Sequence, residues 1–338
     1  MTKKTRYFMA GSAAVLAAGL GTGLIAYYTG GFQPVSASAV ANELRYIPAD
    51  VKMLAYVDVR AIMDSDLRQR LKEALPMHEQ GQKEFQEQTG IDIERDIDYI
   101  VAALAADSQQ ARPLVVARGR FNDTQLEGLI REHGGTVEDY KGKRLVAAPE
   151  GHPAHPGIAT DHLVLAFLEP GLVAFGDGAA VRTAIDAQLS AHSVTTNTEM
   201  MDLVLDIGRN NNAWAVGRFD LLAAQAKLPT EVSSRLPPVK WFAAAGHVNG
   251  GVSGSLRAEA RDDAAGENLR DVVRGFLALA RMQAQADPRT AGLIDSLHLT
   301  GSGKTVALSF SVPAEILDMI PKAPVAPAAP VAPGVSGQ

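Results

Sequence analysis

Residues 300–305 read TGSGKT, the letters that close many phosphate-binding loops. A complete loop needs a glycine five positions before Gly303, so that the backbone can fold around the phosphates, and a helix directly after it. His298 stands at that position, and residues 306–312 alternate apolar and small side chains, which predicts a strand. We therefore expect a glycine-rich hairpin turn here and no nucleotide partner.

Three histidines and one aspartate lie within residues 151–162, and imidazole and carboxylate groups are common zinc ligands. They are His152, His155, Asp161 and His162. Two prolines and two glycines in the same segment indicate a surface loop, and His-x-x-His on a loop lacks the helical spacing that aligns two imidazoles. We expect a loop without a dedicated metal site, with adventitious metal binding as the alternative.

Four acidic side chains, Asp92, Glu94, Asp96 and Asp98, follow one another at every second position. Paired carboxylates serve glycoside hydrolysis, and oxygen clusters bind calcium. The spacing of a calcium-binding loop is missing, whereas acidic residues in the first turns of a helix are favoured by the helix dipole. The pattern predicts helix capping.

Nucleophilic catalysis has no support in the sequence. There is no cysteine and no G-x-S-x-G motif, and the serines of residues 250–255 lie on a predicted strand beside a turn. We predict no catalytic, cofactor-binding or metal-binding residues and a protein that is not an enzyme.

Residues 8–28 carry no charge and follow Lys3, Lys4 and Arg6. At about 1.5 Å per residue, a helix of this length crosses the hydrocarbon core of a bilayer. The basic flank places residues 1–7 in the cytoplasm and the rest of the chain outside, as in a single-pass protein of the cell membrane. A cleavable signal peptide is the alternative, with small-x-small triplets at residues 37–41. Gly19 and Gly23 have the GxxxG spacing that allows two anchors to pack as a homodimer.

Two further segments lie outside the expected folded part. Residues 29–41 form an uncharged linker, and residues 321–338 repeat proline so often that a disordered, extended tail is expected. Residues 1–41 hold three of the 32 basic residues and none of the 38 acidic ones, which leaves 29 − 38 = −9 for the remainder. Nucleic acid is therefore not an expected partner.

A first α+β module is predicted over residues 42–192. It opens with a strand at 53–59 and continues with helical sequence from Asp64 or Ser65, at 80–88 and through 92–105, the last on the spacing of Ile97, Ile100 and Leu104. The remaining elements are a strand at 112–121, a helix at 122–135, a hairpin at 136–149, and strand, turn, strand and helix over 162–189.

A second module is predicted over residues 193–320. Its elements are a helix at 198–208, a strand at 213–223, a hairpin at 241–260 and a long helix from Asp262 or Asp263 to about residue 286. Residues 163–186 and 295–318 share the order strand, turn, strand, helix, which indicates a diverged duplication. The fold class is therefore α+β: a transmembrane helix followed by a duplicated module of mostly antiparallel sheet with covering helices. Two abutting domains and one continuous sheet both remain open.

The segments YIPADVKMLAYVDV at 46–59, LRAEARDDAA at 256–265 and GSGKTVALSFSVPAEIL at 301–317 resemble an uncharacterised family of bacterial envelope proteins. Its members have an N-terminal membrane anchor and a duplicated α+β domain of unknown function. The resemblance implies location and architecture, and it brings no catalytic residues.

The function we expect is that of a membrane-anchored extracytoplasmic protein with a non-enzymatic binding or scaffolding role in the cell envelope. Its partners would be the membrane, through residues 8–28, and unidentified envelope proteins. A carrier or sensor of a small apolar or lipid ligand is the alternative, suggested by apolar helical sequence such as residues 272–286. An envelope hydrolase is the least expected class.

Overall fold

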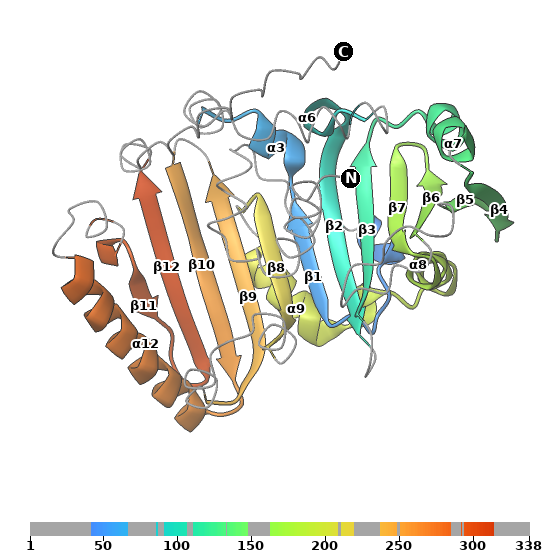
Figure 1. The fold of residues 1–338 in the computed structure, drawn as a ribbon. Coiled ribbons are helices and arrows are strands. Elements are labelled where there is room, and N and C mark those ends of the chain that lie inside the picture. The colour runs from blue at the N-terminus through green and yellow to red at the C-terminus, as the bar shows by residue number, and fades with distance from the viewer. Residues whose placement is uncertain are drawn as a thin grey trace, which may run out of the picture.

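The computed structural model describes residues 42–66, 86, 91–106, 111–132, 134–147, 163–208, 211–219, 237–248, 251–284, 292 and 294–313 (Figure 1). The expected anchor at 8–28, the linker, the histidine segment and the tail lie outside these residues, as do the helical sequence at 80–88, apart from residue 86, and the helix expected after Pro313. No described helix is long and apolar enough to cross a membrane.

Within the described residues, twelve strands form one sheet in which all neighbouring strands are antiparallel (Figure 1). The order is β11-β12-β10-β9-β8-β1-β2-β3-β7-β6-β5-β4. The strands are β1 Met53–Val57, β2 Ile97–Ala106, β3 Ala111–Gly119, β4 Thr136–Tyr140, β5 Lys143–Ala147, β6 Leu163–Glu169, β7 Leu172–Asp177, β8 Ala213–Arg218, β9 Val239–Val248, β10 Gly251–Ala260, β11 His298–Thr300 and β12 Thr305–Pro313. The expected α+β class with a mostly antiparallel sheet is confirmed.

The two predicted modules share this sheet. Strand β1 pairs with β2 on one side and with β8 on the other, so the sheet passes from one module into the other without a break. Outward from this centre the order is β1-β2-β3-β7-β6-β5-β4 in one direction and β8-β9-β10-β12-β11 in the other. The question of one sheet or two is settled in favour of one, while duplication of the module stays a prediction.

The prediction of a helix through residues 92–105 is wrong. Helix α6 covers only Ile93–Asp96, and the chain then continues as the ten-residue strand β2 between β1 and β3. Because β2 is central, both of its faces carry apolar side chains: Val101 and Ala103 contact one core cluster, Ala102 and Leu104 another. An apolar run without alternation does not distinguish such a strand from a buried helix. The first strand also ends earlier than expected, at Val57.

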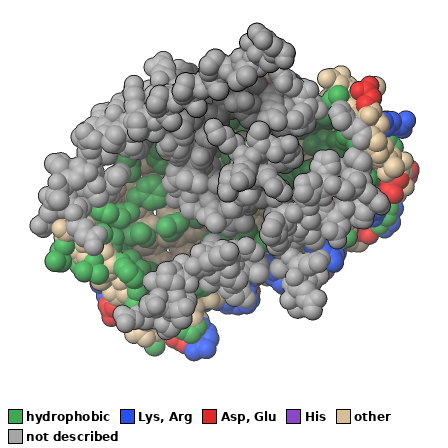
Figure 2. All heavy atoms as spheres, in the orientation of Figure 1, with side chains coloured by type: hydrophobic (Ala, Val, Ile, Leu, Met, Phe, Trp, Pro, Cys, Tyr) green, Lys and Arg blue, Asp and Glu red, His purple; other side chains and the backbone are tan. Residues whose placement is uncertain are grey.

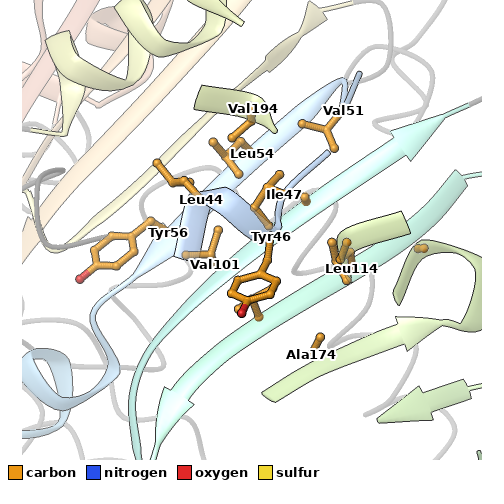
Figure 3. Packing of buried hydrophobic residues seen from close by; sticks show 14 of the residues in the cluster. Leu44, Tyr46, Ile47, Val51, Leu54, Tyr56, Val101, Leu114, Ala174 and Val194 are labelled. Carbon is orange, nitrogen blue, oxygen red and sulfur yellow. The ribbon is translucent and has the colours of Figure 1, made fainter. Parts of the chain in front are cut away.

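One face of the sheet, the first face, is covered by helices. Side chains of η1 and α8 pack on it together with η2 and α9, and form a large buried cluster (Figure 3). In this cluster Leu44 and Tyr46 of η1, with Ile47 directly after it, lie against Leu54 and the neighbouring strands. The elements are η1 Glu43–Tyr46, α8 Gly178–Ser190, η2 Val194–Thr196 and α9 Thr198–Ile207. Burial of each large apolar side chain contributes about 1.5–3 kcal/mol, so this face holds the main core.

The opposite face of the sheet, the second face, carries smaller clusters of buried hydrophobic side chains. Met53, Ala55, Ala215 and Phe242 form one near the centre, and Leu126 of α7 joins another over β5, β6 and β7. Helices α3 Val59–Met63 and α6 lie beside β2, near the middle of the sheet, and α7 Asp123–Glu132 lies beside β4 and β5 at one edge (Figure 1). The long helix α12 Asp263–Ala284 runs beside β11 and β12 at the other edge (Figure 1). The two edges of the sheet are therefore built differently.

Several local predictions are confirmed by backbone geometry. The β4–β5 hairpin turns at Lys141 and Gly142, with φ of 52° and 79°, as a tight turn between antiparallel strands requires. Helix α7 is followed by Gly134 with φ of 86°, the left-handed glycine that ends many helices. Helix α12 begins at Asp263 as expected.

Candidate functional site

The TGSGKT segment forms the turn between β11 and β12. Gly301 and Gly303 have φ of 105° and 55°, and the Thr305 N–H donates to the Ser302 carbonyl at 3.0 Å. Strand β12 begins at Thr305, so no helix N-terminus faces this turn from the following residues. The hairpin interpretation of the motif is confirmed.

This turn supports the beginning of α12. Asp262 caps the helix by accepting a hydrogen bond from the Ala265 N–H at 2.8 Å. Gly266 lies so close to the turn that a Cβ atom there would be 2.2 Å from the Gly303 carbonyl oxygen. Arg270 Nη1 donates to the carbonyl oxygens of Gly303 and Thr305 at 2.8 and 2.9 Å. The glycines thus allow close helix packing.

Beyond these contacts α12 leaves the core. Ala265 and Leu269 are buried, but Phe276, Leu279 and Met282 expose 55%, 56% and 69% of their surface. In the view of Figure 2, hydrophobic side chains gather over the side of the molecule where β9, β10 and β12 lie. Exposed apolar clusters of this kind mark interaction surfaces. We call Phe276, Leu279 and Met282 the apolar face of α12.

On another side of the same helix, α12 and β11 enclose a partly open cavity of about 370 Å³. Leu277 of α12 and Leu299 of β11 contribute apolar walls. Its lining consists of Arg270, Arg274, Leu277, Arg281, Leu297, His298, Leu299, Thr300 and Gly301. Three arginines therefore line a space in which, among the described residues, no aspartate or glutamate belongs to the lining.

The three arginines of the cavity differ in how fully they are engaged. Arg270 is buried, and besides its two carbonyl contacts it binds Glu267 at 2.6 Å. Arg274 uses its Nη1 atom for Asp271, at 2.6 Å, and for Glu267, at 3.3 Å. Arg281 has a single ion pair within the described residues, to Asp295 at 3.9 Å. Arg270 is structural, while Arg274 and Arg281 keep donor groups for a ligand.

The acidic residues 92–98 do not form a common site. Asp92 caps α6 by accepting from the Glu94 N–H at 3.0 Å, and Asp96 accepts from the Asp92 N–H at 2.9 Å. Asp98 lies on β2 and binds Arg60. The capping prediction is confirmed for Asp92. Among the described residues no three His, Asp or Glu side chains gather as metal ligands would.

A buried polar cluster at the η1 end of the first face had no sequence signal. Glu43 is almost fully buried, and its Oε1 accepts from Arg118 Nη2 at 2.5 Å. Tyr46 donates to Glu169 at 2.9 Å, and burial, together with this carboxylate, raises the pKa of Tyr46 to about 12. These residues lie far apart in the chain, so only the tertiary fold brings them together.

Asp58 continues this cluster beside Tyr56. One carboxylate oxygen of Asp58 accepts from the Ala61 N–H at 2.8 Å, which caps α3, whereas the other oxygen and the Tyr56 hydroxyl are buried without a hydrogen-bond partner. Burial raises the pKa of Asp58 to about 6 and also raises the pKa of Tyr56. Neither residue lines the α12–β11 cavity, so we interpret them as structural.

The residues that the sequence singled out as site candidates are not the residues that form the candidate site in the structure. The sequence singled out TGSGKT for its letters, and the structure gives that segment a role in packing α12. Residues 272–286 of α12 stood out in the sequence only as apolar helical sequence, and nothing there indicated that the apolar face is exposed. The cavity arginines carried no signal, because ordinary helix-surface arginines share the same spacing. The histidine segment lies outside the described residues.

The fold and the site together define an α+β protein with one wide antiparallel sheet and an edge helix that carries both an apolar face and a basic cavity.

No family model and no curated protein matches the sequence. Solved structures of a protein named TP0453 are similar in fold over 81% of this chain. Crystal form III has 9% identity, a TM-score of 0.48 and 95% of that chain covered; crystal form I has 10%, 0.44 and 94%. Membership of the resembled envelope family stays a prediction.

Proposed function

We propose that this chain is a non-enzymatic, membrane-anchored protein of the cell envelope, with its folded part outside the cytoplasm, that binds a partner protein through the apolar face of α12. The observation that carries the proposal is the exposure of Phe276, Leu279 and Met282 on a helix whose start is packed into the molecule. The partner we infer is an amphipathic helix of another envelope protein.

The spacing along α12 supports a helical partner. Apolar side chains at positions 265, 269, 272, 276 and 279 follow one another in alternating steps of four and three, which is the seam of a helix pair. The first two are buried against this chain, Val272 is half-buried, and Phe276 and Leu279 are exposed and open to a second helix. Gly275 has no atom within 4 Å of an added Cβ, so a partner backbone can approach closely.

The charges of α12 favour a protein over a lipid surface. Its acidic residues are Asp263, Glu267 and Asp271, and its basic residues are Arg270, Arg274 and Arg281, so the net charge is 3 − 3 = 0. Helices that lie on anionic membranes carry an excess of lysine and arginine on their polar face. The core of a protein interface, in contrast, is depleted of charge, as this seam is.

The proposal is tested with a photo-crosslinking amino acid in the full chain in cells. We expect a probe at Leu279 to form one adduct of defined mass, with the crosslinked peptide mapping to an apolar helical segment of another envelope protein. Phe276→Glu in the same chain should abolish the adduct, because it places a charge in the seam. The matched control is a probe at Leu189 on α8, which is equally exposed at 56%.

Three results would contradict the proposal. They are an adduct at Leu279 no stronger than at Leu189, an adduct with phospholipid, and an adduct only with a second copy of this chain. Location is tested separately by adding protease to intact spheroplasts. If the region after residue 42 stays uncut, the proposed orientation is wrong.

The carrier alternative requires an enclosed apolar cavity. The α12–β11 cavity is partly open and carries three arginines, and it therefore suits a charged ligand better than a wholly apolar one. For this reason partner binding is the function that we infer.

A further inference from the structure

We propose that the α12–β11 cavity binds a small anionic ligand with a phosphate or carboxylate group and a short apolar part. Arg274 and Arg281 would contact the anionic group, and Leu277, Leu297 and Leu299 the apolar part. The cavity lies on a different side of α12 from the apolar face. This site therefore goes beyond the proposed function, and each of the two proposals can be tested without the other.

The charge of the lining is the first argument. Arg270, Arg274 and Arg281 line the cavity, and among the described residues no aspartate or glutamate does. The acidic partners of these arginines, Glu267, Asp271 and Asp295, are not part of the lining. A space bordered by guanidinium groups and without carboxylates favours an anion, because each charged hydrogen bond there is stronger than a neutral one.

Unused donors are the second argument. A guanidinium group has five N–H donors in a planar fork that matches phosphate and carboxylate oxygens. Arg274 makes both of its ion pairs through Nη1, and Arg281 has only the 3.9 Å contact to Asp295 among the described residues. The His298 side chain is exposed and lines the same space. The remaining donors are in place to bind an anionic group bidentately.

The walls of the cavity are held by contacts that do not involve those donors. Strand β11 pairs with β12 through three residue pairs, and buried Arg270 fixes α12 to the turn through the Gly303 and Thr305 carbonyls. The helix and the strand are therefore positioned before a ligand arrives. Such preorganisation lowers the entropic cost of binding.

The size and the three leucines define the ligand further. A volume of about 370 Å³ lies at the small end of ligand pockets, which suits a compact molecule. Leu277, Leu297 and Leu299 give an apolar lining that a bare inorganic ion does not use. The same chemistry occurs in a free alkyl phosphate or fatty acid and in the headgroup region of an anionic phospholipid.

The experiment is calorimetric titration of the full chain, held in neutral detergent, with hexyl phosphate. We expect saturable binding, tighter than that of inorganic phosphate because of the leucines. Arg281→Gln and Arg274→Gln should each weaken the affinity about tenfold or more, since each removes charged hydrogen bonds. Thermal unfolding of each variant checks that the fold is retained.

The matched control is Arg131→Gln on α7. Arg131 is an exposed helical arginine with ion pairing to Glu127 at 2.8 Å, at the other end of the sheet. The substitution Arg131→Gln removes the same charge and should leave the affinity for hexyl phosphate unchanged within about twofold. Absence of saturable binding would overturn the proposal, as would equal affinity for inorganic phosphate, or equal weakening by Arg131→Gln and Arg281→Gln.

The source of the ligand is resolved by competition. The chain is placed in nanodiscs of phosphatidylcholine, with or without phosphatidylglycerol, and titrated again with hexyl phosphate. Competition by phosphatidylglycerol that disappears in Arg281→Gln supports a lipid headgroup in the cavity. Undiminished binding supports a soluble anionic molecule in the same site.

Discussion

Helices α8 and α12 start alike and end in different surroundings. Each follows a strand and is capped by an aspartate, Asp177 in α8 and Asp262 in α12. Side chains of α8 are buried along its length, from Ala180 through Ile185 to Ala187, in the core of the first face. In α12, Leu269 is the last buried apolar side chain among the described residues, and Phe276, Leu279 and Met282 are exposed.

This difference in burial indicates that α8 contributes mainly to the stability of the fold, whereas the outer part of α12 is available for binding. The region of α8 and η1 is closed, and it buries two carboxylates, that of Glu43 in its ion pair with Arg118 and that of Asp58. The first turns of α12 are fixed by Gly266, Arg270 and the TGSGKT turn, and the apolar face beyond them is exposed. Substitutions in the closed region should therefore change the free energy of unfolding, and those in the outer part of α12 should change binding.

The largest contrast is expected between Ile185→Ala and Leu279→Ala. Ile185 is fully buried on α8, so its truncation should lower the free energy of unfolding by about 2–5 kcal/mol. Leu279 is 56% exposed, and its truncation should stay within about 0.5 kcal/mol. Urea unfolding of the full chain measures both. Similar losses for the two variants would show that α12 is packed as tightly as α8.

Asp58 should make the closed region sensitive to pH. Its pKa is raised to about 6 in the folded protein from 3.8, mainly by burial, so the folded state binds this proton more tightly than the unfolded state. This contribution to stability is present below about pH 4 and is lost as the pH rises through 6, by about 3 kcal/mol. Asp58→Asn keeps the cap of α3 and should flatten the dependence between these pH values. An unchanged pH profile in that variant would contradict the assignment.

Two glycines of α12 test where the helix is attached. A Cβ at position 266 would clash with the Gly303 carbonyl, so Gly266→Ala should destabilise the protein by about 1–3 kcal/mol. At position 275 nothing lies within 4 Å, and Gly275→Ala should stabilise the helix by about 0.5–1 kcal/mol. Thermal unfolding of the two variants gives the comparison. The same sign for both would place the attachment of α12 elsewhere.

The smallest effect is expected at the lysine of TGSGKT. Because the segment is a hairpin turn, Lys304→Met should change the free energy of unfolding by less than about 0.5 kcal/mol. Addition of ATP with magnesium should leave the midpoint of thermal unfolding unchanged in both proteins. A rise that is lost in Lys304→Met would restore the phosphate-binding interpretation.

Local signals in the sequence predicted much of the fold. Turn glycines such as Gly142 and Gly134 and the alternation after Thr305 gave the correct hairpins and helix end, because these depend on backbone conformation over a few residues. Strand β2 was missed, because a central strand with two buried faces lacks alternation. The cavity was missed because it joins α12 to β11 from separate parts of the chain.

The sequence by itself determined the α+β class, the antiparallel hairpins, the start of α12 and the hairpin turn at TGSGKT, since each follows from local periodicity and turn chemistry. Only the tertiary structure decided that the two modules share one sheet, through the pairing of β1 with β8. It also decided that Ile185 is buried while Leu279 is exposed. Both helices are amphipathic, and what covers an apolar stripe depends on contacts between distant segments, which no local pattern encodes.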